Sequence, residues 1–233
     1  MRAIFLYTLL MPINKDRVLF RDDSFLAVQK LSGELVVKGK GPVGKLPLLD
    51  FLKKTEVGLR PLNRLDFETS GVVLFARTKK GFDAALAAMK SGAKPWVKTY
   101  RTIVKGRMPR ERGEIDFKLP ARAGGEKIPA STKFRVLDRF PTVTYVEAQI
   151  ETGRHHQIRR HLSAIGHPLV LDSVYGDEKF NRAFGRELRF HRFFLHAFSF
   201  DFTHPLTGEH LHIEAPLPES FNAVLKRLGG GGR

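Results

Sequence analysis

The chain has 233 residues and is 42% hydrophobic, which is enough to bury a sizeable core and is typical of a folded protein. It contains no Cys, so disulfides, thiolate metal sites and thiol nucleophiles are excluded. Lys and Arg number 40 against 24 Asp and Glu, and the resulting net charge of +16 favours a polyanionic partner, either nucleic acid or an acidic membrane. We expect one domain over residues 1–233, with 229–233 as a flexible tail.

The first residues imitate a signal peptide, because Arg2 precedes the apolar stretch 3–11. No small-x-small cleavage site follows, and the stretch is far shorter than the roughly 20 residues that span a bilayer. We therefore expect it to close the core as a strand or short helix, in a cytoplasmic protein.

The next part of the chain is rich in predicted strands. Residues 18–20 and 25–29 have the pattern of short strands, and a turn at 30–33 leads to a third apolar stretch at 35–37. The loop 38–45 has the outline of a phosphate-binding P-loop, but Leu46 and Pro47 follow it where Ser or Thr and a helix would be needed. We therefore reject a nucleotide site there, and expect a helix to begin at about residue 48.

The stretch Pro61–Gly71 holds the first candidate for chemistry. It contains Arg64-Leu65-Asp66 and runs directly into the apolar segment 72–76. A carboxylate and a guanidinium on a turn held by a buried strand occupy the kind of place where reactive groups are found. The alternative is an Asp that caps a turn beside a solvated Arg. Asp66 is our candidate for the reacting group.

A helix and several strands are predicted between residues 81 and 150. Residues 81–90 have apolar side chains at helical spacing, and 96–104 alternate as a strand that places Lys98 and Tyr100 on one face. The Gly- and Arg-rich segment 106–128 is expected to carry a small hairpin of its own. Two further alternating strands are predicted at 132–137 and 142–150.

A basic helix is predicted after residue 150. We expect Thr152 to cap it, Ile158, Leu162 and Ile165 to form its buried stripe, and Gly166 to end it. The other face carries His155, His156, Arg159 and Arg160. A zinc site would need His residues four apart, whereas His155 and His156 precede His161 by six and five with no acidic residue between, so we predict no metal. Either a solvated charged face or a phosphate-binding row with one Arg turned inward to a carboxylate remains, and we favour the second.

The remaining segments are a basic loop, a Phe-rich strand, a short strand and a helix. The loop carries Lys179, Arg182, Arg186 and Arg189. The strand at 193–202 places Phe194, Phe198, Phe200 and Phe202 on one face, which we expect to lie in the core rather than to stack on bases. A strand at 211–215 and a helix at 218–228 complete the prediction.

Several motifs occur in a fixed order along residues 17–220. They are Arg64-Leu65-Asp66-x-x-Thr69-Ser70-Gly71, Lys98-x-Tyr100, Thr152-Gly153-Arg154-x-His156-Gln157-Ile158-Arg159-x-His161, Gly166-His167-Pro168, Tyr175-Gly176-Asp177, Leu195-His196-Ala197 and His204-Pro205-x-Thr207-Gly208. This set resembles the RluA-type pseudouridine synthases. The chain resembles most the tRNA-modifying TruC branch, a short form without an S4 domain.

The resemblance implies an α+β fold, in which a bent, mainly antiparallel sheet carries the active site in a basic cleft. It implies a cofactor-free isomerase that breaks the uridine N1–C1′ bond, rotates the uracil and rejoins it through C5. Asp66 would be the catalytic carboxylate, Tyr100 would pack on the target base, and Arg159 would pair with Asp66. The residues expected to contact RNA are Arg64, Lys98, Arg154, His155, His156, Gln157 and Arg160.

These roles are physically consistent. An Arg beside Asp66 would lower the pKa of the carboxyl group, which would then be ionised and able to attack C1′ or to remove a proton at C2′. A uridine within an RNA helix must be flipped out to reach it, at a cost that phosphate contacts would offset. We expect a monomer that acts on structured RNA, tRNA in preference to rRNA, without a metal, a nucleotide or another cofactor.

Three positions depart from the pattern of the family. Asn63 stands where His is usual, Leu31 replaces a common Pro, and Leu171 replaces a Gly before Asp172. None of these is Asp66 or Arg159, so they bear on the choice of substrate more than on activity. Two other functions stay open: a basic RNA-binding protein or chaperone on the same scaffold without turnover, and an acidic-membrane binder. The second lacks an amphipathic basic helix with an aromatic or Leu-rich face.

Overall fold

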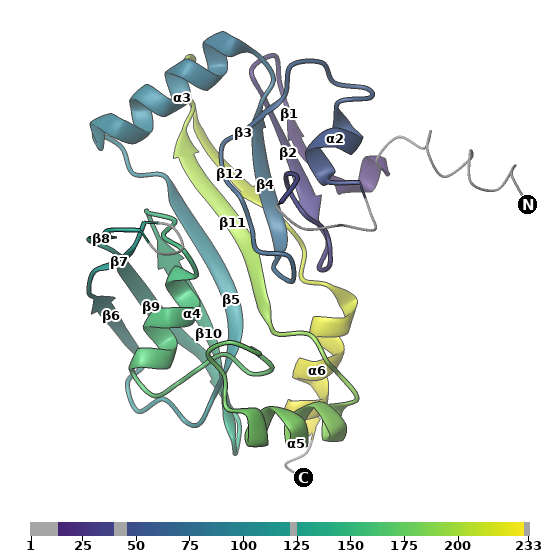
Figure 1. Cartoon of the computed structure of the whole chain (residues 1–233), viewed down its shortest axis with the longest axis vertical. Coiled ribbons are helices and arrows are strands. Elements are labelled where there is room, and N and C mark those ends of the chain that lie inside the picture. Colours follow the sequence, from purple (N-terminus) through teal and green to yellow (C-terminus); the bar gives the residue numbers. More distant parts are fainter. Residues whose placement is uncertain (1–13, 40–45, 122–124, 231–233) are drawn as a thin grey trace, which may run out of the picture. The chain divides into compact units, whose positions relative to one another are not determined.

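The computed structural model describes residues 14–39, 46–121 and 125–230, which form helices and antiparallel strands of an α+β protein (Figure 1). The chain divides into two compact units, residues 1–94 with 202–215 and residues 95–201 with 216–233. The single domain expected over 1–233 stays a prediction. The predictions for residues 3–11 and for most of the P-loop-like segment lie outside the described residues.

The first unit is built on the strand order β1-β2-β4, in which all pairs are antiparallel. Every residue of β4 is buried, and the register that pairs Phe25 with Ala76 also pairs Lys30 with Gly71. Lys30 therefore lies beside the point where the Asp66 loop enters β4. The elements of this unit are η1 Lys15–Arg17, β1 Val18–Arg21, β2 Phe25–Lys30, α2 Leu48–Leu52, β3 Arg60–Pro61, β4 Ser70–Ala76, α3 Lys79–Ser91 and β12 His210–Glu214.

The second unit has the antiparallel strand order β11-β5-β10-β9-β6. Its helices α5 and α6 contribute Phe184, Leu188, Phe221 and Val224 to one apolar cluster, which the sheet completes. The elements are β5 Val97–Lys105, β6 Arg112–Asp116, β7 Leu119–Pro120, β8 Lys127–Ile128, β9 Ser131–Arg139, β10 Val143–Ile150, α4 Gln157–Ala164, α5 Glu178–Leu188, β11 Leu195–Thr203 and α6 Glu219–Gly230; the last residues of β11 belong to the first unit.

Most predicted elements are confirmed, including the hairpin within 106–128, which is β7 paired with β8. The strand expected at 35–37 is absent from the described residues. The carbonyls of Leu35 and Val36 instead accept hydrogen bonds from Leu48 N (2.8 Å) and Leu49 N (3.0 Å), the first amides of α2. Amides at a helix N-terminus have no partner within the helix, so this segment serves as its cap.

The predicted start of the basic helix was wrong. The helix begins at Gln157, and His156 occupies its N-cap in the left-handed region with φ 54°. The Thr152 hydroxyl donates to Gln157 Oε1 (2.8 Å) instead of accepting from a helix amide. Ile158 and Leu162 are buried as predicted, but Ile165 is 40% exposed because the helix ends before it.

The predicted Phe stripe of β11 is largely core. Phe194, Phe200 and Phe202 are each about 1% exposed, whereas Phe198 lies at a bulge between Ala197 and Ser199. There the Arg101 guanidinium carbon stands 3.5 Å from the centroid of the Phe198 ring. The bulge breaks the alternation on which a single continuous stripe depended.

A buried ion pair fixes α4 to the loop after it. Arg159 Nε and Nη2 donate to the two Asp172 oxygens at 2.6 and 2.8 Å, and their side chains are 6% and 0% exposed. Burial by itself would raise the pKa of Asp172, but the Arg159 bonds and the amides of Tyr175 and Val174 outweigh burial and lower it below its ordinary value. The carboxylate is therefore charged at neutral pH. A buried acid can stay charged only when a cation is paired with it, and Arg159 is that cation.

None of the helices within the described ranges combines the length and the apolar content that crossing a bilayer requires.

Asp172→Asn is expected to lower the free energy of unfolding by about 3–5 kcal/mol at pH 7, because it removes one charge of a buried pair. Since the pKa of Asp172 is lowered in the folded state, the pair stabilises the protein above the ordinary Asp value of 3.8 and this contribution is lost as the pH falls through the folded pKa. Urea unfolding of both proteins between pH 7 and pH 3 measures the difference.

The matched control is Asp83→Asn, which removes the carboxylate of an exposed pair with Lys79. Exposed pairs contribute little, about 0.5 kcal/mol, so this variant should unfold almost as the wild type does. Equal losses from the two substitutions, or a difference for Asp172→Asn that does not shrink in acid, would contradict the assignment.

Candidate active site

Asp66 lies on the loop between β3 and β4 of the first unit. Leu65 is buried at 8% exposure, Asp66 is half-buried, and Arg64 and Phe67 are exposed. The Thr69 amide donates to the Asp66 carbonyl at 3.2 Å and closes a turn. One buried apolar side chain thus anchors the loop directly beside Asp66.

Lys30 holds the backbone of this loop. Its side chain is 0% exposed, and Nζ donates to the carbonyls of Leu31 (3.0 Å), Phe67 (3.0 Å) and Thr69 (2.6 Å). Burial lowers the pKa of Lys30 to about 8, and the nearby carboxylates of Glu34 and Asp66 act in the opposite direction. At neutral pH the group is an ammonium with three N–H donors, one for each carbonyl.

Asn63 fixes the other end of the loop to β4. Its side-chain amide donates to Val72 O (3.1 Å), and its Oδ1 accepts from Leu74 N (2.8 Å). An amide side chain provides one donor and one acceptor, as a strand backbone does, so Asn63 extends the pairing at the edge of β4. This contact gives the departure at position 63 a structural role.

In the second unit, β5 carries Lys98 and Tyr100. Tyr100 is 7% exposed, and its neighbours across the sheet are Ala148 and Ala197. Burial, and to a lesser extent the charge of Arg154, lowers the pKa of Lys98 to about 8. Its Nζ lies 5.8 Å from the centroid of the Phe200 ring. Both side chains are thus packed into the sheet rather than extended into solvent.

Arg159 is held on several sides. Besides its bonds to Asp172, its guanidinium carbon lies 5.1 Å from the Tyr175 ring centroid and 4.8 Å from that of Phe193. The Arg160 guanidinium also lies 5.2 Å from the Tyr175 ring, and the Tyr175 hydroxyl contacts His156 Nδ1 at 3.1 Å. Tyr175 therefore contacts three of the predicted basic residues of α4 and its N-cap.

The other predicted RNA-binding residues divide into two groups. The rings of His155 and His156 are stacked with centroids 3.8 Å apart and are half-buried, as is Arg154. Gln157 is 3% exposed, and its amide binds Thr152 Oγ1, Arg154 N and Ser131 O. These bonds give Gln157 a structural role, and its contact with RNA stays a prediction.

The predicted catalytic residues are distributed over both units. Asp66 and Arg64 belong to the first, whereas Tyr100 and Arg159 belong to the second. The ion pair expected between Asp66 and Arg159 therefore stays a prediction. The sequence analysis missed Lys30 and Asp172 as supporting residues. The sequence signals were a charged residue at the end of the strand pattern 25–29 and another directly after the apolar run 169–171.

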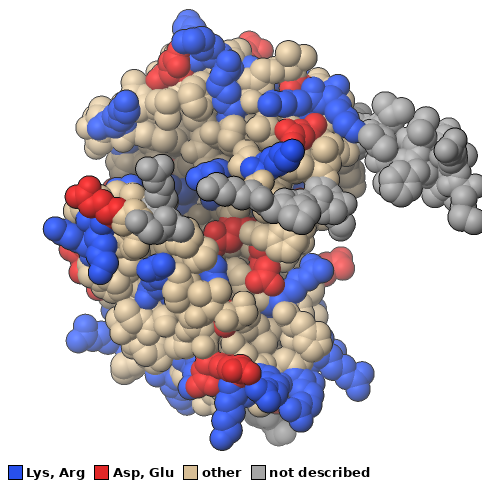
Figure 2. Space-filling view, in the orientation of Figure 1, with Lys and Arg blue, Asp and Glu red and all other residues tan. Residues whose placement is uncertain are grey.

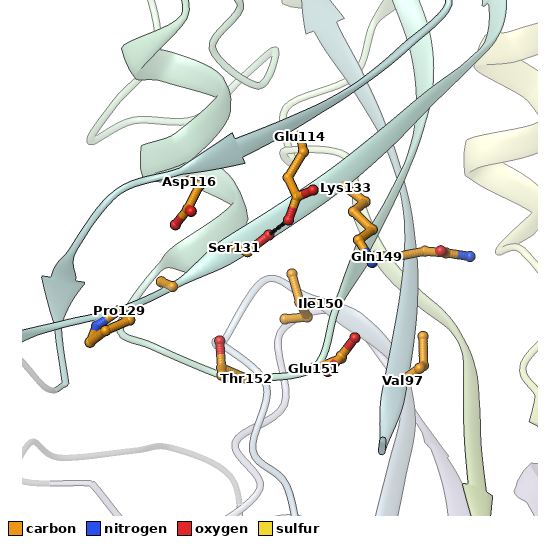
Figure 3. Close-up of a pocket in the computed structure, with 11 residues that line it drawn as sticks. Val97, Glu114, Asp116, Pro129, Ser131, Lys133, Gln149, Ile150, Glu151 and Thr152 are labelled. Atoms are coloured by element: carbon orange, nitrogen blue, oxygen red, sulfur yellow. Dashed lines mark hydrogen bonds between the residues drawn. The ribbon is translucent and has the colours of Figure 1, made fainter. Parts of the chain in front are cut away.

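The second unit also contains a hollow of about 400 Å³ at the ends of β5, β6, β9 and β10 (Figure 3). Glu114, Asp116 and Glu151 line it, Lys133 is the one cation in its lining, and Ser131 donates to Glu114. None of the predicted site residues lines it. An acidic lining repels phosphates, so this hollow is poorly suited to RNA.

Comparison with known proteins identifies the family. The model of a family described as RNA pseudouridylate synthase matches residues 24–164. "Ribosomal large subunit pseudouridine synthase C" of Haemophilus influenzae is 34% identical over 92% of this chain and 69% of the relative, and the Escherichia coli K12 protein of that name is 34% identical over 91% and 70%.

Solved structures agree with this result. Human RNA Pseudouridylate Synthase Domain Containing 1 superposes with a TM-score of 0.70 at 26% identity, over 91% of this chain and 90% of that one. Human RNA Pseudouridylate Synthase Domain Containing 4 shares the fold with a TM-score of 0.75, over 97% and 96%. The two bacterial relatives are named for the large ribosomal subunit, so the predicted placement in the tRNA-modifying TruC branch is not supported. The chain belongs to the RNA pseudouridylate synthase family and is an isomerase.

Proposed function

We propose that this protein converts uridine to pseudouridine in large-subunit ribosomal RNA, with Asp66 as the catalytic carboxylate. The observation that carries the proposal is the Asp66 loop itself. It presents Arg64-Leu65-Asp66 on a backbone fixed by the buried Lys30, inside the segment that the family model matches. The choice of rRNA follows the names of the similar proteins, two of which are 34% identical to this chain.

The proposed chemistry requires one ionised carboxylate. Asp66 either attacks C1′ of the target nucleotide or removes a proton from C2′, and in both routes the N1–C1′ bond breaks. The uracil then rotates and a C5–C1′ bond forms; in the first route this step breaks the Asp66–C1′ bond, and in the second Asp66 returns the proton to C2′. The C5 proton is then released to solvent, and N1 gains a proton. Arg159, oriented by Asp172, would pair with the Asp66 carboxylate and stabilise its negative charge, and Tyr100 would pack against the uracil during its rotation.

RNA binding is attributed to basic groups of both units. Arg64 is exposed beside Asp66, and Arg160 with the stacked His155 and His156 lies at the start of α4. Lys and Arg also gather over α5 at the lower edge of the face drawn in Figure 2. The exposed cations of α5 and its C-cap are Lys179, Arg182, Arg186 and Arg189. Neutralising phosphates releases counterions, so binding should weaken steeply with added salt.

Asp66→Asn is expected to abolish the reaction while RNA binding persists, because the amide can neither attack C1′ nor accept the C2′ proton. Release of tritium from RNA containing 5-³H-uridine should fall by about 10³-fold or more, as when other enzymes lose their reacting group. Asp83→Asn, on the exposed face of α3, serves as the control and should release tritium at the wild-type rate.

Two outcomes would contradict the proposal. Unchanged release by Asp66→Asn would exclude Asp66 as the reacting group. Tight binding of rRNA by the wild type without any release would indicate a non-catalytic RNA-binding protein or chaperone.

The substrate is tested in cells that lack the protein. Chemical marking and sequencing of pseudouridine should show at least one site missing from large-subunit rRNA and restored by the wild type but not by Asp66→Asn. A loss confined to tRNA would contradict the choice of rRNA while leaving the activity in place.

Lys30→Met tests whether the hydrogen bonds from Lys30 to the backbone of the Asp66 loop are needed for activity. Met has an unbranched side chain of similar size but provides no donor, so the Thr69 carbonyl loses a buried partner at a cost of about 1–3 kcal/mol, and the Phe67 carbonyl keeps only its bond from the Gly33 amide. We expect kcat for pseudouridine formation to fall at least about tenfold, because small displacements of a reacting group are costly, with little change in KM for RNA. Lys80→Met, at an exposed position of α3, is the control, and equal kcat values for the two variants would show that the hold is not needed.

A further inference from the structure

Phe67, the residue directly after Asp66, is unusual in its exposure. Half of its surface (50%) is open to solvent, whereas Leu65 on the other side of Asp66 is 8% exposed. Leaving a Phe side chain in water forgoes the stabilisation of burying it, and most Phe residues are buried. The position therefore suggests a ring that is covered only when a ligand is bound.

The backbone at Phe67 is fixed in a way that presents the ring. Its carbonyl accepts hydrogen bonds from Lys30 Nζ (3.0 Å) and from the Gly33 amide (2.8 Å). The ring cannot turn inward by a shift of the loop without breaking these bonds, one of which is charge-assisted. A backbone fixed in this way leaves only the side-chain torsions of Phe67 to be ordered when a ligand binds, which favours affinity.

A second exposed apolar side chain projects from the same hydrogen-bonded junction. Leu31 is 45% exposed, and its carbonyl accepts from the same Lys30 ammonium at 3.0 Å. Arg64, an exposed cation, lies three residues before Phe67. An aromatic ring, an aliphatic side chain and a guanidinium on adjoining backbone segments match the flat face and the phosphate of a nucleotide.

We propose that Phe67, with Leu31 beside it, is a stacking platform for an unpaired base of the RNA next to the uridine that reaches Asp66. The proposal rests on the proposed function. A flipped nucleotide leaves its neighbours without a stacking partner, and an aromatic ring can replace that partner whatever the base. Phe67 is thus a positioning residue that keeps the opened RNA in place, and it takes no part in bond breaking.

The first experiment compares RNA binding by Phe67→Ala and Phe67→Trp. The probes are an unmodified large-subunit rRNA transcript and a fully paired RNA duplex. Phe67→Ala should weaken binding of the transcript about 5- to 150-fold, the range for losing one base–aromatic stack, and should leave duplex binding unchanged. Phe67→Trp should bind both RNAs as the wild type does.

Two controls separate stacking from other effects. Leu86→Ala removes a side chain of α3 that is 38% exposed, and it should not change binding of either RNA. The slope of log K against log salt should be the same for Phe67→Ala and the wild type, because Phe67 contacts no phosphate. A changed slope would indicate that the substitution disturbed the basic residues, and would count against stacking.

The second experiment detects stacking directly, by fluorescence quenching of a Trp at position 67. Trp96 is the one natural Trp and is 5% exposed, so Phe67→Trp adds a single exposed fluorophore. In the Asp66→Asn background, which should not turn over, the added emission should be quenched by the transcript and not by the duplex. Unquenched emission together with wild-type binding by Phe67→Ala would overturn the proposal.

These measurements do not depend on turnover. If the wild type forms no pseudouridine but Phe67→Ala still loses affinity for the transcript alone, the proposed activity fails and the stacking platform stands. If pseudouridine is formed and Phe67→Ala binds and reacts as the wild type does, the platform fails and the activity stands.

Discussion

A buried ammonium group is the interaction on which the proposed catalytic loop depends. Lys30 is the last residue of β2, and its side chain is fully buried, so water does not solvate its charge. The desolvation of the charge is compensated by three backbone carbonyls, two of which belong to residues 67 and 69. The group that stabilises Lys30 is therefore the backbone that must be held still around Asp66.

The second unit also stabilises a buried cation, with a charged carboxylate as its partner in place of neutral carbonyls. Arg159 is 5% exposed and lies beside a carboxylate and two aromatic rings, which provide charge, hydrogen bonds and polarisable surface. In both units a buried cation is held in place by hydrogen-bond acceptors. Rigidity of the supporting groups is what a catalytic constellation requires, since misplacement by about 1 Å is costly.

The sequence was sufficient to predict the strands and helices that depend on local pattern. Alternation identified β5, β9 and β10, and apolar runs identified β2 and β4. It failed where a longer-range contact decides the structure. Residues 35–37 have strand-like side chains, but the amides of α2 take their carbonyls, and Thr152 has the chemistry of a cap but binds the Gln157 side chain.

The candidate site divides in the same way. A sequence motif can identify Asp66, Tyr100 and Arg159 as candidates, because the proposed reaction requires these residue types at these positions. It did not nominate Lys30 or Asp172, whose roles come from burial and from partners distant in sequence. Lys30 is 37 residues from Phe67, and Arg159 is 13 residues from Asp172. Hydrogen bonds of this kind are properties of the packed structure, which a linear pattern does not contain.

The conformation of the loop that carries Asp172 is fixed by several contacts. Leu171 adopts φ 63°, in the left-handed region, at a position where Gly would carry no strain. Its amide donates to Asn181 Oδ1 (2.7 Å), and Asn181 Nδ2 donates to Asp172 O (3.0 Å). A Cβ at Gly176 would lie 2.2 Å from that carbonyl, so no larger residue fits.

A strained backbone conformation at a non-glycine residue persists only where several surrounding contacts enforce it. Here Leu171 also packs against the apolar cluster of α5 and α6, and this contact offsets part of the backbone strain, which a Gly would not have. Through the ion pair with Asp172, this loop sets the direction of the Arg159 side chain. The orientation of the proposed partner of Asp66 is therefore determined by α5 and its preceding loop, elements that contain none of the predicted catalytic residues.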